Sequence, residues 1–158
     1  VILSLVELNK TMNKSIRFSI GADNNSNCVL IAKKYLTRMN YDTKTYGSLN
    51  KDSMSWVEVA EKVALDVQKN SSDFGILFCY TGTGVTIVAN KFKGIRAALC
   101  NNTEIAIGAR KWNDANILSI STLTVKDEDI ENIIASWIET KVDKSEMKNI
   151  EKISGIEV

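Results

Sequence analysis

Short apolar runs alternate along this chain with longer segments in which apolar residues recur every three or four positions. Residues 74–80 are apolar almost throughout, which is typical of a parallel strand buried on both faces. Residues 56–67 instead place their valines and alanines on one helical face, behind a possible capping box of Ser55 and Glu58. By these criteria we expect strands at 16–20, 41–46, 74–80, 95–100 and 115–121, and helices at 28–39, 56–67, 84–90, 103–111, 127–140 and from 144 onward.

The alternation of strands and helices predicts the fold class. It indicates a doubly wound, Rossmann-like α/β sandwich of three layers with about five parallel strands. No linker or repeat interrupts the pattern, so we expect one domain over residues 12–158, and a disordered extension over residues 1–11. Ligands of such sheets bind at the carboxyl ends of the strands, which directs attention to the loops at 21–27, 79–84 and 100–103.

Charge and cysteine usage narrow the classes of partner. The net charge of +1 gives no electrostatic reason to expect nucleic acid or a membrane surface as partner. No apolar run approaches the roughly 20 residues that span a bilayer. Cys28, Cys79 and Cys100 are far apart and odd in number, which favours a reducing cytoplasm over a disulfide framework or a metal-binding pair.

The chain contains no histidine. It therefore lacks the usual acid–base side chain near neutral pH and the commonest nitrogen ligand of metals. Any acid–base chemistry must use other groups, and we expect no bound metal.

The loop at 79–84, Cys-Tyr-Thr-Gly-Thr-Gly, follows the most buried predicted strand. Its glycines let the backbone turn sharply and approach a ligand closely, and its amides can hold a phosphate or an enediolate oxygen. The plain alternative is a small buried Cys79 followed by an ordinary turn.

Other glycine-rich loops fit less well. A dinucleotide-binding pattern fails because Ile87 stands where its third glycine belongs, and a Walker loop lacks its Gly-Lys ending. A flavodoxin-type phosphate loop fits residues 81–86, but that loop belongs after the first strand and this one follows the third.

A second motif makes the loop specific to one family. Cys79, Thr81, Gly82 and Gly84 are followed at fixed spacing by Ala-Asn-Lys-Phe-Lys-Gly-Ile-Arg-Ala at 89–97. Together these residues resemble the signature of the ribose-5-phosphate isomerase B / galactose-6-phosphate isomerase family. The resemblance extends to Gly-Ala-Asp at 21–23 and Arg-Lys-Trp-Asn-Asp-Ala-Asn at 110–116, and covers roughly residues 16–140.

The resemblance implies an aldose–ketose isomerase of sugar phosphates that works through an enediolate, without metal or organic cofactor. It implies that Cys79 is the base that moves a proton between two carbons. Thr81 would assist proton transfer between the two oxygens, and the amides of Gly82, Thr83 and Gly84 would form the anion hole. A positioned base and oxyanion donors are what this chemistry needs.

The same resemblance implies a substrate-binding set. Asp23 and Asn113 would hold sugar hydroxyls or the enediolate, and Asn24 would contact hydroxyls. Lys144 and Lys148, on one helix face, would stand for C-terminal arginines that reach into a neighbouring subunit's site. A homodimer or homotetramer follows from this. The plain alternatives are a turn residue for Asp23 and a solvated helix face for the lysines.

The sequence also departs from the family pattern. Asn24 and Trp112 stand where the family has histidines, the second of which opens the sugar ring. Leu123 stands near the position of a phosphate-binding arginine, and Ser55-Trp56 replaces a Tyr-Pro element. We interpret Trp112 as core or interface packing.

Two functions from different classes follow. The first is isomerisation of a sugar phosphate, with ribose 5-phosphate and ribulose 5-phosphate as the family default; an open-chain, four-carbon substrate would need no ring-opening histidine. The second is a non-catalytic sugar-phosphate-binding protein, or the partner subunit of a hetero-oligomeric isomerase. A flavodoxin-like electron carrier is a third possibility.

Overall fold

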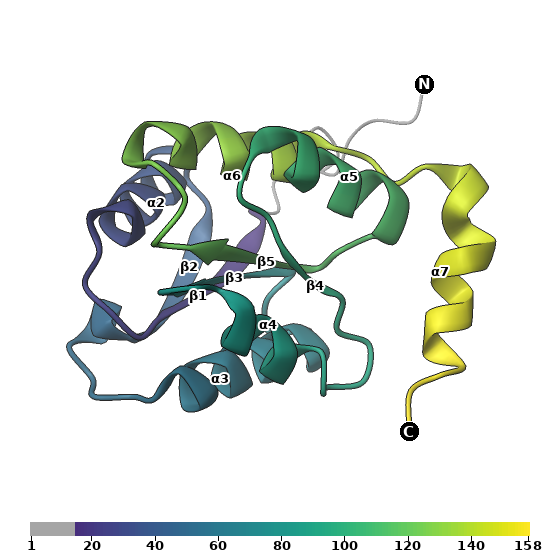
Figure 1. Cartoon of the computed structure of the whole chain (residues 1–158), viewed down its shortest axis with the longest axis horizontal. Coiled ribbons are helices and arrows are strands. Elements are labelled where there is room, and N and C mark those ends of the chain that lie inside the picture. Colours follow the sequence, from purple (N-terminus) through teal and green to yellow (C-terminus); the bar gives the residue numbers. More distant parts are fainter. Residues whose placement is uncertain (1–14) are drawn as a thin grey trace.

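Five parallel strands form one sheet at the centre of the computed structural model, which describes residues 15–158. Their order across the sheet is β2-β1-β3-β5-β4 (Figure 1). The strands are β1 (Arg17–Ala22), β2 (Asp42–Gly47), β3 (Phe74–Cys79), β4 (Ala97–Leu99) and β5 (Ile117–Ser121). The chain runs outward from β1 to β2 and then returns to the other side of β1, so the winding reverses between β1 and β3.

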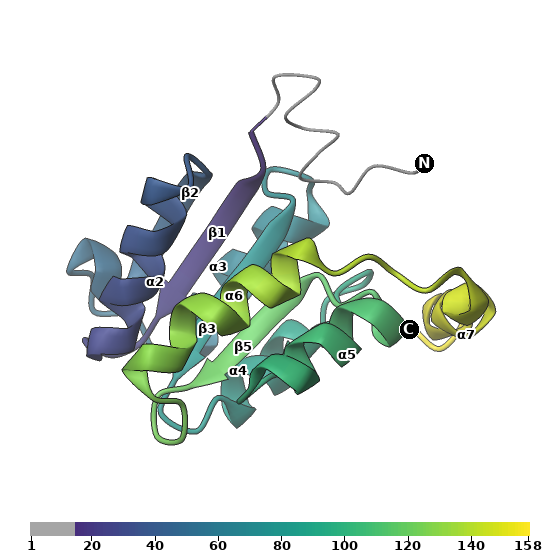
Figure 2. The same cartoon turned by 90° about the horizontal axis from the view of Figure 1, so that it is seen from above.

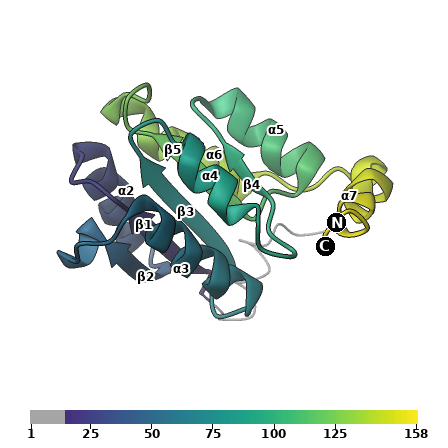
Figure 3. The same cartoon turned by 60° about the horizontal axis from the view of Figure 1, so that its bottom comes forward.

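Helices cover both faces of this sheet. The helices α2 (Asn27–Arg38), α5 (Thr103–Asn113) and α6 (Ile130–Glu139) pack on one face, as the view from above shows (Figure 2). The helices α3 (Trp56–Gln68) and α4 (Thr83–Ala89) pack on the opposite face (Figure 3). The predicted doubly wound sandwich of three layers with five parallel strands is therefore confirmed.

The last helix, α7 (Met147–Ser154), stands beside the sandwich rather than on it (Figure 1). It follows the short helical turn η3 (Lys144–Glu146), where Asp143 accepts a hydrogen bond from the backbone N–H of Ser145 at 2.9 Å. Two further short turns are η1 (Ser48–Asn50) and η2 (Asp127–Asp129). Within residues 15–158, every helix is too short or too polar to cross a membrane.

The hydrophobic pattern predicted most element boundaries to within two residues. The capping box at the start of α3 is confirmed, since Glu58 N–H donates to the Ser55 hydroxyl and Ser55 N–H donates to the Glu58 carboxylate. The strand expected at 95–100 is shorter, because only Ala97–Leu99 joins the ladder with β5. The extension expected at residues 1–11 lies outside the described residues.

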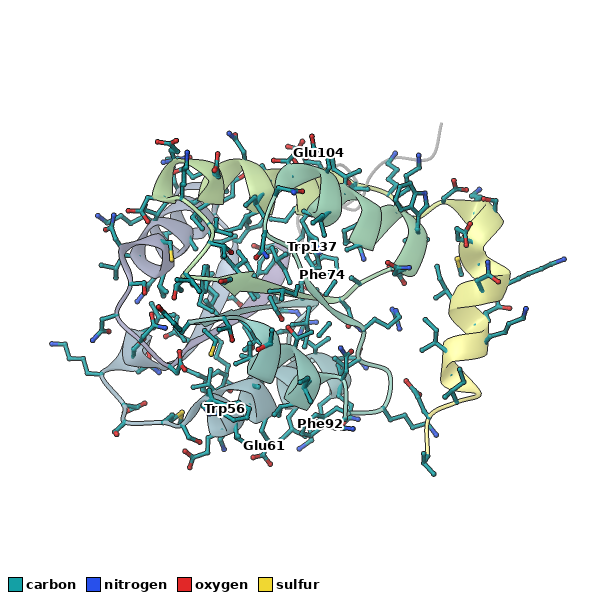
Figure 4. All side chains as sticks on the ribbon, in the orientation of Figure 1. Trp56, Glu61, Phe74, Phe92, Glu104 and Trp137 are labelled. Carbon is teal, nitrogen blue, oxygen red and sulfur yellow. The ribbon has the colours of Figure 1, made fainter. Side chains whose placement is uncertain are left out.

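An aromatic and cationic cluster fills the core under α6. Trp137 is fully buried, and its ring centroid lies 4.9 Å from that of Phe74 (Figure 4). The guanidinium of Arg110 lies 5.2 Å from the Trp137 ring centroid and donates to Asp114 Oδ1 at 2.7 Å. Arg110 is buried, although arginine is mostly exposed in proteins.

A second polar group, Asp66, ties α3 to β1 and β2. Its carboxylate accepts hydrogen bonds from Ser19 at 2.6 Å, Tyr46 at 2.7 Å, Lys44 at 3.0 Å and Ser71 at 3.0 Å. Burial by itself would raise the pKa of Asp66, but these hydrogen bonds lower it overall. The carboxylate is therefore held in its charged form within the folded protein.

Candidate active site

The winding reverses at the carboxyl ends of β1 and β3, the position where open α/β sheets form a ligand-binding crevice. Open parallel sheets bind ligands at such a switch point, because the connections leave it in opposite directions. The loop after β1 carries Asp23 and Asn24, and β3 ends at Cys79. Although these residues lie far apart in the chain, β1 and β3 are paired in register through Ala22 and Phe78.

Cys79 and Asp23 meet in this crevice. The Cys79 thiol donates to Asp23 Oδ2 with a sulfur–oxygen distance of 3.3 Å, and Cys79 is only 8% exposed. The side-chain N–H of Asn24 donates to the other carboxylate oxygen at 2.9 Å. Asp23 is thus held between a thiol on one side and an amide on the other.

The electrostatics of Cys79 differ from those of a freely ionised cysteine. Burial raises the pKa of its thiol, and the hydrogen bond to Asp23 with the charge of that carboxylate raises it further. The backbone N–H groups of Gly82 and Tyr80 lower the pKa by a smaller amount. In the free chain the group is therefore a protonated thiol at neutral pH.

The loop after Cys79 turns sharply into α4. Gly82 adopts a φ of 75°, which favours glycine because a side chain there is strained. The Thr86 hydroxyl donates to the Gly82 carbonyl at 2.6 Å, and the hydroxyls of Thr81 and Thr83 are 2.8 Å apart. These contacts fix the loop directly after the thiol.

The loop after β1 is fixed equally closely. The Ser48 hydroxyl donates to the Asn24 carbonyl at 2.6 Å, and the backbone N–H of Ser26 donates to Asn24 Oδ1 at 3.2 Å. The Ser26 hydroxyl also donates to Asn24 Oδ1. Asn24 therefore organises its own loop as well as binding Asp23, a role that the sequence did not reveal.

Exposed apolar side chains surround the crevice. Tyr80 is 62% exposed and Leu123 is 55% exposed, and the backbone N–H of Leu123 donates to the Tyr80 carbonyl at 3.0 Å. The Trp56 ring lies against Gly84, where an added Cβ would approach it to 2.9 Å. The sequence singled out position 56 only as a departure from the family, without indicating that the ring covers the glycine loop.

The remaining predicted residues lie at the opposite edge of the sheet. Asn113 ends α5, which starts at the carboxyl edge and runs back to the amino edge. Lys144 and Lys148 are exposed on η3 and α7, which follow α6 on that same side. One chain therefore brings together Cys79, Thr81, Asp23, Asn24 and the loop glycines, but not Asn113 or the two lysines.

A groove of about 660 Å³ borders Asn113 at that amino edge. It is lined by Phe92, Ile95 and Ala98 on one side and by Ile153 and Ile156 of the C-terminal segment on the other. Trp112, which we expected to pack in the core or an interface, is 53% exposed in the single chain, so core packing is wrong and an interface role stays a prediction.

The protein is similar to a family of known isomerases. The profile of the family described as Ribose/Galactose Isomerase matches residues 19–156. A ribose-5-P isomerase B of Listeria innocua is 37% identical over 105 residues, which cover 66% of this chain and 71% of that protein. A D-erythrulose-4-phosphate isomerase of Pectobacterium atrosepticum is 32% identical over 132 residues, covering 80% and 84% of the two chains.

The fold comparison agrees. The structure of a ribose-5-phosphate isomerase B from Clostridium thermocellum superposes with a TM-score of 0.84 at 31% identity, over 90% of this chain and 97% of that one.

Proposed function

Because this chain belongs to the ribose/galactose isomerase family of sugar-phosphate isomerases, we propose that it interconverts an aldose phosphate and its ketose through an enediolate, with Cys79 as the base. The observation that carries the proposal is the position of Cys79. It ends a central strand at the switch point of the sheet, next to a carboxylate and directly before a tightly fixed glycine loop.

The proposed reaction assigns each proton. The Cys79 thiolate takes a proton from the carbon next to the carbonyl, and the C–H electrons form the enediolate. The resulting thiol returns the proton to the neighbouring carbon. Thr81 assists proton exchange between the two oxygens, and the amides of residues 82–84 hold the negative oxygen, an interaction worth a few kcal/mol per donor.

Ribose 5-phosphate is the default substrate, as in the similar protein of Listeria innocua. The absence of histidine favours a second candidate, because no copy of this chain can supply an imidazole to open a sugar ring. A tetrose 4-phosphate needs no such group, since its phosphate occupies the hydroxyl that would close a furanose ring. The similarity to a D-erythrulose-4-phosphate isomerase supports this candidate.

We further propose that the active unit is a homodimer or homotetramer in the cytoplasm. Asn113, Lys144 and Lys148 lie at the amino edge, so they reach the Cys79 crevice only from another copy. The exposed lysines would supply the cationic groups that a phosphate requires. The groove beside Asn113 and the exposed Tyr80 and Leu123 offer apolar surface that such an interface would cover.

Mixing two inactive variants tests the shared site. Cys79→Ala and Asn113→Ala are purified separately, mixed, and allowed to exchange subunits. If the site is shared, half of the dimers carry one intact site, so the mixture recovers about a quarter of wild-type activity. No recovery, or full activity of Asn113→Ala by itself, would contradict the shared site.

The decisive experiment is an isomerase assay over aldose and ketose phosphates of four to six carbons. Wild type is compared with Cys79→Ala and with Cys79→Ser, which replaces the thiol with a hydroxyl of similar size that is a far weaker acid. We expect turnover of at least one substrate and its loss in both variants. Solvent deuterium should enter the substrate carbon during turnover. Full activity of Cys79→Ala would refute the assigned base.

The alternative is a non-catalytic binder or the partner subunit of a hetero-oligomer. Asn24, Trp112 and Leu123 favour it, because each replaces a group that the family uses for ring opening or phosphate binding. Binding of a sugar phosphate by calorimetry, without turnover or deuterium incorporation at any carbon, would support this alternative.

A further inference from the structure

The contact between Cys79 and Asp23 joins the end of β3 to the loop after β1. The carboxylate is fixed from its other side by Asn24, whose side-chain N–H donates to Oδ1 at 2.9 Å. Its Oδ2 accepts from the thiol at 3.3 Å. Since Cys79 is 8% exposed, the thiol proton is directed at this carboxylate rather than at solvent.

Few other charged groups face the thiol. The helix α4 carries no charged side chain, and the residue paired with Cys79 on β5 is Ser121. On α3, Val59 and Val63 pack toward the sheet while Glu58 is engaged by Ser55.

The more distant charged groups are exposed. Glu61, Lys62 and Lys126 are open to solvent, and Tyr80 is 62% exposed. Near Asp23, Lys33 and Lys51 line a small pocket beside the Asn24 loop. Asp23 is the ionisable side chain that hydrogen-bonds the thiol, and its charge also acts on it.

We propose that Asp23 is a positioning residue that keeps Cys79 protonated and aimed in the free protein, and that substrate hydroxyls release the thiol by taking over the hydrogen bonds of this carboxylate. On release the thiol loses its proton to water, and the thiolate becomes the base of the isomerisation. The first half of the proposal, that Asp23 keeps the thiol protonated, concerns the free protein. The second half, release of the thiol by substrate, rests on the proposed function.

The physical reason lies in competition for one acceptor. A carboxylate next to a thiol opposes thiolate formation through like charge and stabilises the protonated form by accepting its hydrogen bond. Hydroxyl groups that donate to the same oxygens satisfy the carboxylate and disperse its charge. The base is then formed only when a substrate is present, and the thiol is protected from oxidation and alkylation at other times.

Alkylation of Cys79 by iodoacetamide tests the first half directly. The rate is followed by mass spectrometry of the Cys79 peptide from about pH 6 to pH 10, because the thiolate is the reacting form. In Asp23→Asn the loss of the charge should lower the pH midpoint by about one unit and raise the rate at neutral pH about tenfold. Asp52→Asn, which changes an exposed carboxylate of a neighbouring loop, should keep the wild-type midpoint.

A second variant separates charge from loosening of the loop. Asn24→Ala removes the donor to Asp23 Oδ1 but leaves the carboxylate, so alkylation should be no faster than in wild type. A midpoint in Asp23→Asn equal to or above the wild-type midpoint would overturn the proposal. Equal acceleration in both variants would also overturn it, because loop loosening would then explain the effect. Circular dichroism verifies that each variant is folded.

The second half is tested by the pH dependence of turnover. The midpoint of kcat/KM reports the free enzyme and that of kcat reports the complex. In wild type we expect the pH midpoint of kcat to lie below the pH midpoint of kcat/KM. In Asp23→Asn the two pH midpoints should coincide, whether or not the maximal rate changes. Coinciding midpoints in wild type would refute the release by substrate. If no sugar phosphate is turned over, the proposed function fails while the alkylation result still decides the role of Asp23.

Discussion

An alanine at position 82 would perturb the loop that follows the candidate base. Gly82 has a φ of 75°, and a Cβ placed there would lie 2.5 Å from Leu99 Cδ1, 3.2 Å from Ser121 N and 3.3 Å from the Ile120 carbonyl carbon. The Leu99 methyl is the end of a flexible side chain and can rotate away. The other two atoms belong to the backbone of the central strand β5, so the loop itself must move.

The magnitude follows from these two effects. Placing an alanine in the left-handed region costs about 1–2 kcal/mol relative to glycine. Crowding against a backbone that cannot yield adds about 1–3 kcal/mol. We therefore expect Gly82→Ala to lower the free energy of unfolding by about 2–5 kcal/mol.

The chain provides a matched control in Gly94. Its φ is 78°, nearly that of Gly82, but a Cβ there would meet no atom of residues 15–158 within 4 Å. Gly94→Ala should therefore cost only the backbone term, about 1–2 kcal/mol. The difference between the two variants isolates the steric contact of the loop with β5.

Urea unfolding measures the free energy of unfolding of both variants, and the isomerase assay measures their kcat/KM. Gly82→Ala should reduce kcat/KM at least about tenfold, because displaced amides no longer fit the developing oxyanion. Gly94→Ala should retain nearly wild-type kcat/KM. If Gly82→Ala destabilised the protein no more than Gly94→Ala, or kept full activity, the assigned packing of the loop on β5 would be wrong.

Three further predictions concern the core. Asp66→Asn should lower the free energy of unfolding by about 2–4 kcal/mol at neutral pH, because Ser19 and three other donors lose a charged acceptor. The pKa of Asp66 is lowered in the folded state. The stability that the carboxylate contributes is therefore complete above the unfolded pKa of about 3.9 and is lost as the pH falls through the folded pKa. In urea titrations at acidic pH, the difference in unfolding free energy between wild type and Asp66→Asn should shrink. Trp137→Ala should cost about 3–5 kcal/mol, and Trp137→Phe should cost much less, because the indole N–H has no hydrogen-bond partner among the described residues. Burial raises the pKa of Cys100 to about 12, so mass spectrometry should find it unalkylated at neutral pH until the protein is unfolded, and labelling of the native protein would refute its burial.

The boundaries of most elements could be predicted because local patterns encode them. The buried run of β3 and the capping box of α3 depend on neighbouring residues, so both were visible in the sequence. The strand β4 was predicted too long because apolar residues such as Ile95 are buried without joining the ladder. Hydrophobicity reports burial, whereas strand length depends on which backbone groups find a partner.

The buried position of Arg110 shows the same limit. Arginine is mostly exposed in proteins, so nothing in the linear order indicated that this side chain lies in the core. The structure buries it because Phe74 and Trp137 offer their ring faces and Asp114 accepts its hydrogen bond. Asp114 is the i+4 neighbour of Arg110 at the end of α5, but Phe74 and Trp137 come from β3 and α6 and are far from it in sequence.

By itself the sequence determined the family and the fold class, since a glycine loop, its spacing to residues 89–97 and the alternation of periodicities are properties of the linear order. It also showed that these 158 residues contain no histidine. Only the tertiary structure decided that the thiol of Cys79 faces Asp23, and that Asn113 and the two lysines lie at the far edge of the sheet. The physical reason is that such contacts depend on strand order and helix direction, which the whole chain sets when it packs both faces of one sheet.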